Sequence, residues 1–157
     1  MKKLTLLLLF VLSAFFLLSC KKSALYEEKV TFLNANWAFE NKIVMFSADM
    51  KGSEKPYTII IELDLIGVPN VDKINAVFTM TTPKGGKTMK SVVFNFQNPQ
   101  EPYIIKNSKE KTYRLTVYPK KYFPETGTYT FEVNQLSHKA DNYGIRSLKL
   151  RIEKAKE

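Results

Sequence analysis

YTIIIELDL, residues Tyr57 to Leu65, is the stretch of this chain that decides its fold. Every second residue in it is large and apolar, and the positions between include Thr58, Glu62 and Asp64. Successive side chains of a strand point to opposite faces, so this period of two predicts a strand with one face on a core and the other toward solvent. No part of the chain shows helical periodicity over a length that would predict a helix.

The same alternation recurs on both sides of this stretch. The further predicted strands are Tyr26–Leu33, Ile43–Asp49, Ile74–Thr81, Thr88–Phe96, Lys111–Tyr118, Thr128–Asn134 and Ile145–Glu153. Residues 51–56, 67–70, 83–86 and 119–126 are predicted turns or corners. The long polar connection 97–110 contains Tyr103–Ile105, a possible short edge strand.

About eight strands at short, regular intervals, without helices between them, predict an all-β fold. The expected architecture is an antiparallel β-sandwich, either immunoglobulin-like or jelly-roll-like. Residues 123–129 resemble the tyrosine corner of such sandwiches, in which a tyrosine hydroxyl bonds back to the preceding loop. We therefore assign Tyr129 a structural role.

The N-terminal segment has the layout of a cleaved secretory signal. Lys2 and Lys3 precede an apolar run that ends near Leu18 and is too short to span a bilayer. The sequence Leu17-Leu18-Ser19-Cys20 resembles the bacterial lipobox. In such signals, cleavage occurs before the cysteine, which then carries fatty-acyl chains such as palmitate. Several chains on one residue suffice for stable anchoring.

This layout divides the chain into three parts. Residues 1–19 are the predicted signal peptide, residues 20–24 are the lipidated cysteine and a short tether, and residues 25–157 form one sandwich domain. Removal of the signal leaves a formal charge of about +7. Anionic lipids, acidic glycans or an acidic protein are possible partners for this charge. Because the lysines are scattered along the sequence, we expect mainly a solvated surface and no nucleic-acid binding.

The residues do not predict an enzyme. His138 is the only histidine and lies in a polar loop, and no metal-ligand spacing is present. Glu62 and Asp64 share one strand face and resemble a glycosidase pair only loosely; solvent-facing acids are the commoner case. We expect no catalytic residue, no metal and no cofactor.

Trp37 and Tyr103 are the candidate contact residues. Exposed aromatic side chains can stack on sugars or bind partner proteins, although a tryptophan more often packs on a core edge. These residues favour a carbohydrate-binding lipoprotein as the alternative function.

Several different short motifs follow one another along the mature chain. In order they are Tyr26, Asn34-Ala35-Asn36-Trp37, Pro83-Lys84-Gly85, Gly127-Thr128-Tyr129-Thr130-Phe131, Gln135, and Gly144-Ile145 leading to Leu150-Arg151-Ile152-Glu153-Lys154. Behind a lipobox, this set resembles the gliding-motility lipoprotein GldH family of the Bacteroidetes. The resemblance does not extend to Leu136-Ser137-His138-Lys139 or to the loop 66–72.

The resemblance implies a membrane lipoprotein that is accessory to the gliding or envelope machinery and acts through protein contacts, with no catalytic residue or ligand to transfer. Lys21 follows the cysteine where inner-membrane lipoproteins of enteric bacteria carry aspartate. Lys21 and Lys22 also differ from the acidic residues typical of surface-exported Bacteroidetes lipoproteins. We therefore expect the outer membrane, with the domain facing the periplasm.

Overall fold

The structure is a computed structural model that describes residues 24–97, 103–105, 107 and 109–156. The predicted signal peptide and Cys20 lie outside these residues. The strands are β1 Ala24–Thr31, β2 Ile43–Met50, β3 Ser53–Ile66, β4 Lys73–Thr81, β5 Lys87–Asn95, β6 Tyr103–Ile105, β7 Glu110–Phe123, β8 Gly127–Gln135 and β9 Ile145–Lys154. Two short 3-10 helices, η2 Leu33–Ala35 and η3 Phe39–Asn41, lie between β1 and β2.

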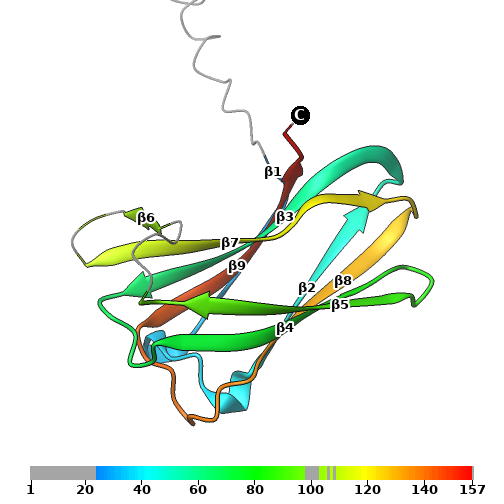
Figure 1. Cartoon of the computed structure of the whole chain (residues 1–157). Coiled ribbons are helices and arrows are strands. Elements are labelled where there is room, and N and C mark those ends of the chain that lie inside the picture. Colours follow the sequence, from blue (N-terminus) through cyan, green and yellow to red (C-terminus); the bar gives the residue numbers. More distant parts are fainter. Residues whose placement is uncertain (1–23, 98–102, 106, 108, 157) are drawn as a thin grey trace, which may run out of the picture.

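The strands form two antiparallel sheets packed face to face (Figure 1). One sheet has the order β1-β9-β3-β7-β6 and the other has the order β2-β8-β4-β5. The all-β sandwich predicted from the alternating pattern is therefore confirmed. The short strand β6 extends the first sheet at its edge by pairing with β7.

The strand order decides between the two sandwich types. β1 pairs with β9, β2 with β8, β3 with β7 and β4 with β5, as in an antiparallel ribbon folded in half. This is the jelly-roll arrangement of two Greek keys, with β6 added. The immunoglobulin-like alternative is wrong, because its first two strands are neighbours in one sheet, whereas β1 and β2 lie in different sheets.

The core lies between the sheets and is built by the predicted inward residues. Ile59, Ile61, Leu63 and Leu65 of β3 are buried there, and β3 is central because it pairs with both β7 and β9. Burial of each such aliphatic side chain contributes ~1.5–3 kcal/mol to folding. Tyr129 packs on Phe123, and its Oη accepts the backbone N–H of Glu125 at 3.1 Å. The structural role assigned to Tyr129 is confirmed.

Two predicted turns are shorter than expected. β3 begins at Ser53 rather than after Pro56, and β7 continues through Pro119 to Phe123. The pairing register shifts where these prolines lie, since Tyr57 pairs with Lys121 whereas Ile59 pairs with Tyr118. A β-bulge tolerates a proline because the extra residue needs no ladder hydrogen bond.

Trp37 is fully buried, with 0% exposure, so its prediction as a glycan or partner contact is wrong. Its ring stacks on Phe32 at a centroid distance of 5.4 Å, and its Nε1 donates to the carbonyl of Asn41 at 3.0 Å. Trp37 lies in a segment between two strands, which suggested exposure. That segment folds back over the core. Tyr103 lies on β6, and its side chain falls outside the described part of the structure.

Candidate functional site

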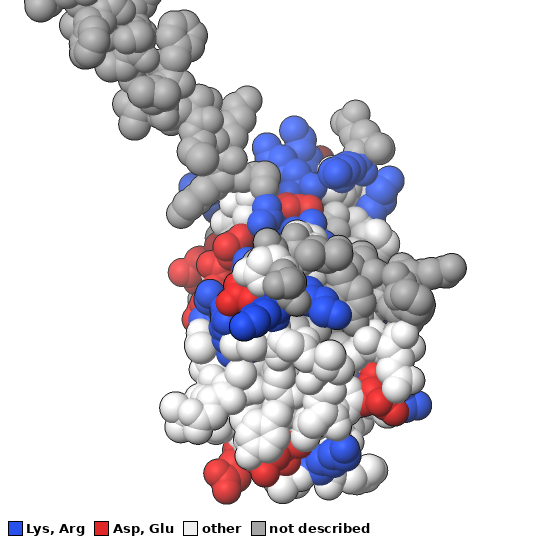
Figure 2. Space-filling model, turned by 90° about the vertical axis from the view of Figure 1, so that its left-hand side faces the viewer, with Lys and Arg blue, Asp and Glu red and all other residues white. Residues whose placement is uncertain are grey.

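One end of the sandwich is built from three connections that are far apart in sequence. These connections, residues 32–42, 66–72 and 136–144, are called the loop end here. The N–H of Phe39 donates to the carbonyl of Ala140 at 2.8 Å, and Lys139 Nζ donates to the carbonyl of Asn70 at 3.0 Å. Figure 2 shows a broad band of uncharged side chains across the lower half of this side of the molecule, with acidic and basic side chains at the very bottom.

Asn142 fastens two of these connections together. Its side chain is buried, Nδ2 donates to the carbonyl of Trp37 at 2.9 Å, and Oδ1 accepts from Ser137 Oγ at 2.9 Å. Its own N–H donates to Asn36 Oδ1 at 2.8 Å. Because a buried amide with several partners fixes one arrangement, the loop end is preorganised by its own polar contacts.

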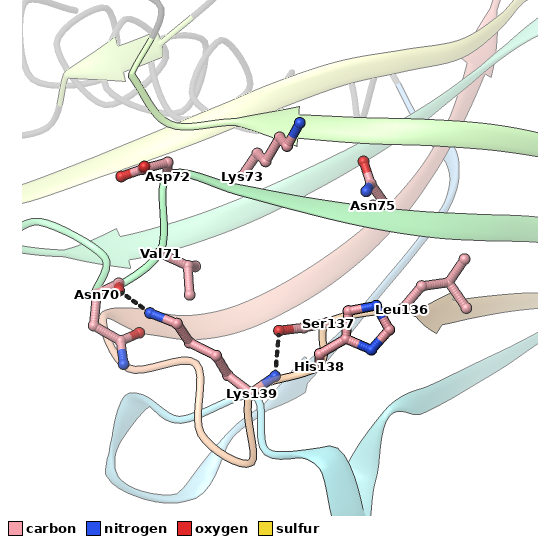
Figure 3. A pocket seen from close by; sticks show the side chains of 9 residues that line it. All are labelled: Asn70, Val71, Asp72, Lys73, Asn75, Leu136, Ser137, His138 and Lys139. Atoms are coloured by element: carbon pink, nitrogen blue, oxygen red, sulfur yellow. Dashed lines mark hydrogen bonds between the residues drawn. The ribbon is translucent and has the colours of Figure 1, made fainter.

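A groove crosses the loop end where β4 begins and β8 ends. Its first part, of about 380 Å³, is lined by Asn70, Val71, Asp72, Lys73, Asn75, Leu136, Ser137, His138 and Lys139 (Figure 3). Its second part, of about 460 Å³, shares Asn75 and residues 136–138 and adds Phe39, Lys42, Asn134 and Gln135. Together they form the loop-end groove, each part within the range of small-molecule sites.

Two amide atoms of the groove residues lack hydrogen-bond partners among the described residues. They are Asn134 Oδ1 and Gln135 Nε2, and both are buried. Gln135 uses its other amide atom, Oε1, to accept the N–H of Ser137 at 2.7 Å. An unsatisfied buried polar atom costs ~1–3 kcal/mol, so each of these two atoms favours an ordered water beside it.

The groove presents groups that are suited to binding. His138 is exposed, and no nucleophile paired with a base is seen among the groove residues. Within the described ranges, no group of three or more histidine, cysteine, aspartate or glutamate residues is placed to hold a metal ion. Lys42 Nζ lies over the ring of Phe39 at 4.4 Å, which gives the groove one cationic and aromatic corner.

Glu62 and Asp64 form a second polar cluster, on the outer face of the β1-β9-β3-β7-β6 sheet. The expectation that these acids face solvent is wrong, because Glu62 is 3% exposed and Asp64 is 8% exposed. Neighbouring strands cover them: Glu62 contacts Lys149 at 2.9 Å and Arg114 at 2.5 Å. Asp64 accepts from Thr112 Oγ1 at 2.6 Å and from Ser147 Oγ at 3.0 Å.

These contacts determine the charge of the cluster. Burial alone would raise the pKa of Glu62, but hydrogen bonds and charge from Lys149 and Arg114 outweigh it and hold that pKa below its ordinary value. Burial alone would lower the pKa of Lys149, but Glu62 outweighs it in the same way and raises that pKa. A general acid needs a raised carboxyl pKa, whereas that of Glu62 is lowered. Its contacts with Arg114 and Lys149 suit it to holding neighbouring strands together.

The groove combines segments that sequence reasoning treated separately. The two stretches in which the chain departs from the family resemblance, 66–72 and 136–139, both contribute residues to it. Asn134 and Gln135 were missed, because an unpaired amide becomes visible only when its surroundings are known. Cys20 lies outside the described residues.

No model of a known protein family and no curated protein matches this chain. None of the helices in the described part is long and apolar enough to cross a membrane.

Proposed function

We propose that this protein is a membrane-anchored lipoprotein that acts without catalysis, through protein contacts made at the loop end. In this proposal Cys20 carries the lipid, the jelly roll is a rigid support, and the partner is a component of the envelope. The family resemblance favours the gliding machinery as that component's setting, at the outer membrane and facing the periplasm.

Exposed apolar side chains around the loop end carry this proposal. Leu33 is 84% exposed and Val68 is 85% exposed, and Phe39, Leu136 and Tyr143 are about half exposed. Hydrogen bonds link the segments that hold them, for example from the N–H of Asn70 to the carbonyl of Tyr143 at 3.2 Å. Exposed apolar groups gathered on one surface are typical of protein–protein contacts.

The test is a pair of polar substitutions, Leu33→Ser and Val68→Ser, in the full chain expressed in its host. Both side chains are almost fully exposed, so the free energy of unfolding should change by less than ~0.5 kcal/mol for each. Recovery of the envelope partner after mild detergent extraction should fall by tenfold or more, as for contact residues worth over ~1 kcal/mol.

A matched control is Met45→Ser with Met89→Ser, two exposed methionines on the outer face of the β2-β8-β4-β5 sheet. These changes should leave partner recovery unchanged. Equal loss in both double variants would place the contact elsewhere than at the loop end. Normal spreading and normal surface-protein display after deletion of the gene in a gliding host would remove the gliding assignment.

Carbohydrate binding is the second candidate, and the loop-end groove is the observation that favours it. Polar side chains that line the groove, among them Asn75, Ser137 and Lys139, can form hydrogen bonds with sugar hydroxyls. Phe39 offers an aromatic face for the apolar side of the ring.

Phe39→Ala tests this candidate, and Tyr122→Ala is the control. Tyr122 is similarly exposed but lies near the C-terminal end of β7, at the opposite end of the sandwich from the groove. Glycan-array binding that is lost in the first variant and kept in the second would favour carbohydrate binding. An absence of binding to any envelope or dietary glycan would remove it. Trp37→Ala is unsuitable because it would leave a large hole in the core.

A further inference from the structure

We propose that the end of the sandwich opposite the loop end binds anionic phospholipid headgroups. It is called the tether end and comprises the start of β1, residues 51–56, 82–87, 120–126 and 153–156. The proposal rests on the lipid anchor of the proposed function and adds a second membrane contact made by the folded domain itself.

Backbone and side-chain contacts join the segments of the tether end into one surface. The N–H of Gly52 donates to Thr126 Oγ1 at 3.0 Å, and the N–H of Lys84 donates to Glu125 at 3.2 Å. The N–H of Ala155 donates to the carbonyl of Pro56 at 3.1 Å, and Ala24 pairs with Glu153. The described chain therefore begins at the same end at which these turns meet.

This surface is rich in lysine. Its lysines are Lys51, Lys55, Lys84, Lys87, Lys120, Lys121, Lys154 and Lys156. The acidic residues there, counting the strand position next to the β2–β3 turn, are Asp49, Glu54, Glu125 and Glu153. Lysines thus outnumber acids two to one, and most of these lysine side chains are exposed.

The lysines are scattered along the sequence, and for that reason we expected a merely solvated surface. The jelly roll changes this interpretation, because several of its turns lie at the same end. Lysines that are far apart in sequence therefore come together there. Figure 2 shows lysine and arginine side chains gathered at the top of the molecule. In Figure 1, β1 begins and the chain ends near the top as well.

Chain geometry brings this surface close to the membrane. Cys20 is four positions before Ala24, and four residues span at most ~14 Å when extended. Coulombic attraction to an anionic surface acts over a Debye length of ~8–10 Å in physiological salt. A lipid on Cys20 would therefore place the tether end within reach of headgroups. Lipid chains and basic residues commonly act together in this way.

The test measures partition of the mature protein, residues 20–157, onto vesicles by sedimentation. Cys20→Ser prevents lipid attachment, so only the domain and tether contribute. Vesicles of phosphatidylcholine with about one third phosphatidylglycerol should bind the protein, and vesicles of phosphatidylcholine alone should not. Raising the salt from ~0.03 M to ~0.3 M should release the protein.

Two matched triple variants locate the contact. Lys51→Gln, Lys55→Gln and Lys154→Gln remove three exposed charges at the tether end, and the partition coefficient should fall roughly a hundredfold. Lys73→Gln, Lys109→Gln and Lys139→Gln remove three exposed charges in or beside the loop end, since Lys73 directly follows residues 66–72 and the carbonyl of Lys109 accepts the N–H of Gly67. The coefficient should then fall less than about fivefold.

Equal loss in both triple variants would show attraction by net charge alone and overturn the proposal. Binding to neutral vesicles, or no binding to anionic ones, would overturn it too. Fatty-acid labelling of Cys20 and partner recovery at the loop end are measured separately, so failure here leaves the proposed function standing, and the reverse also holds.

Discussion

At the scale of single residues, Glu62 shows how a charge is stabilised on a sheet face. It lies on the central strand β3, between Arg114 of β7 and Lys149 of β9, so that one carboxylate joins three strands. Removal of one member of a buried ionic cluster leaves the others unbalanced, which costs more than the pair is worth in itself. The cluster therefore makes stability depend on the protonation of Glu62.

Because the pKa of Glu62 is lowered in the folded state, its contribution is present above the unfolded value of about 4.5. It is lost as the pH falls from there through the folded pKa. We expect the urea midpoint of the wild type to decrease below about pH 4.5. Glu62→Gln should lower the free energy of unfolding at pH 7 by ~2 kcal/mol and flatten this decrease.

The comparison variant for Glu62→Gln is Glu132→Gln, on the outer face of the other sheet, where Glu132 pairs with Met45 and Thr79 across the strands. It should change the free energy of unfolding at pH 7 by less than ~0.5 kcal/mol. An unchanged acid profile in Glu62→Gln would show that another group governs the loss of stability.

Tyr129 gives a second residue-scale prediction. Tyr129→Phe keeps the ring against Phe123 but leaves the N–H of Glu125 without its acceptor. The free energy of unfolding should decrease by ~1–2 kcal/mol in urea denaturation. Tyr122→Phe removes a hydroxyl from an exposed side chain and should have almost no effect. Equal effects of the two changes would contradict the corner role.

At the scale of elements, the strands were predictable and their ends were not. Alternation of apolar residues identified the central parts of β3, β4, β8 and β9, since a one-residue slip would expose the whole core face. Pro56 and Pro119 were taken to mark turns, whereas each lies within a strand where the register shifts. A bulge depends on the partner strand, and that information is not local in sequence.

The suggestion that Trp37 is exposed was also wrong, because the residue is buried. Its neighbours are polar, so it was a candidate for exposure, and the fold closes residues 136–144 over it through Asn142. For the same reason the groove was not predictable: its residues come from β4, β8 and their flanking loops. Only the departures from the family resemblance pointed to these segments.

Two glycines provide an element-scale test of how tightly the loop end is packed. Gly85 and Gly144 both have positive φ, of 85° and 88°. A Cβ at Gly85 would meet no atom within 4 Å, whereas one at Gly144 would lie 2.8 Å from Pro69 Cα. Gly85→Ala should cost ~1 kcal/mol in the free energy of unfolding. Gly144→Ala should cost ~2 kcal/mol more, because the backbone of the β3–β4 turn must move.

Urea denaturation of both variants makes this comparison. Since the two glycines have nearly the same φ, the difference between the variants reports mainly the steric part. Gly144→Ala should also reduce partner recovery, because Val68 belongs to the displaced turn. Equal costs for the two substitutions would show that the β3–β4 turn yields freely and that the loop end is not preorganised.

At the scale of the whole molecule, the jelly roll separates two surfaces of different chemistry. The loop end presents apolar side chains and a groove, and the tether end presents lysines. β3 runs between them, and its fourteen residues span ~45 Å at ~3.3 Å per residue. At that separation, no side chain belongs to both surfaces, so substitutions at one end should act independently of those at the other.

This independence gives the last prediction. Leu33→Ser with Val68→Ser should reduce partner recovery and leave vesicle partition within about twofold of the wild type. The tether-end lysine variant should do the reverse, and the combined variant should show both losses at their separate sizes. If the lysine variant alone also released the partner from the extracted protein, the partner would contact the tether end. The lysines would then belong to a protein interface rather than to a membrane contact.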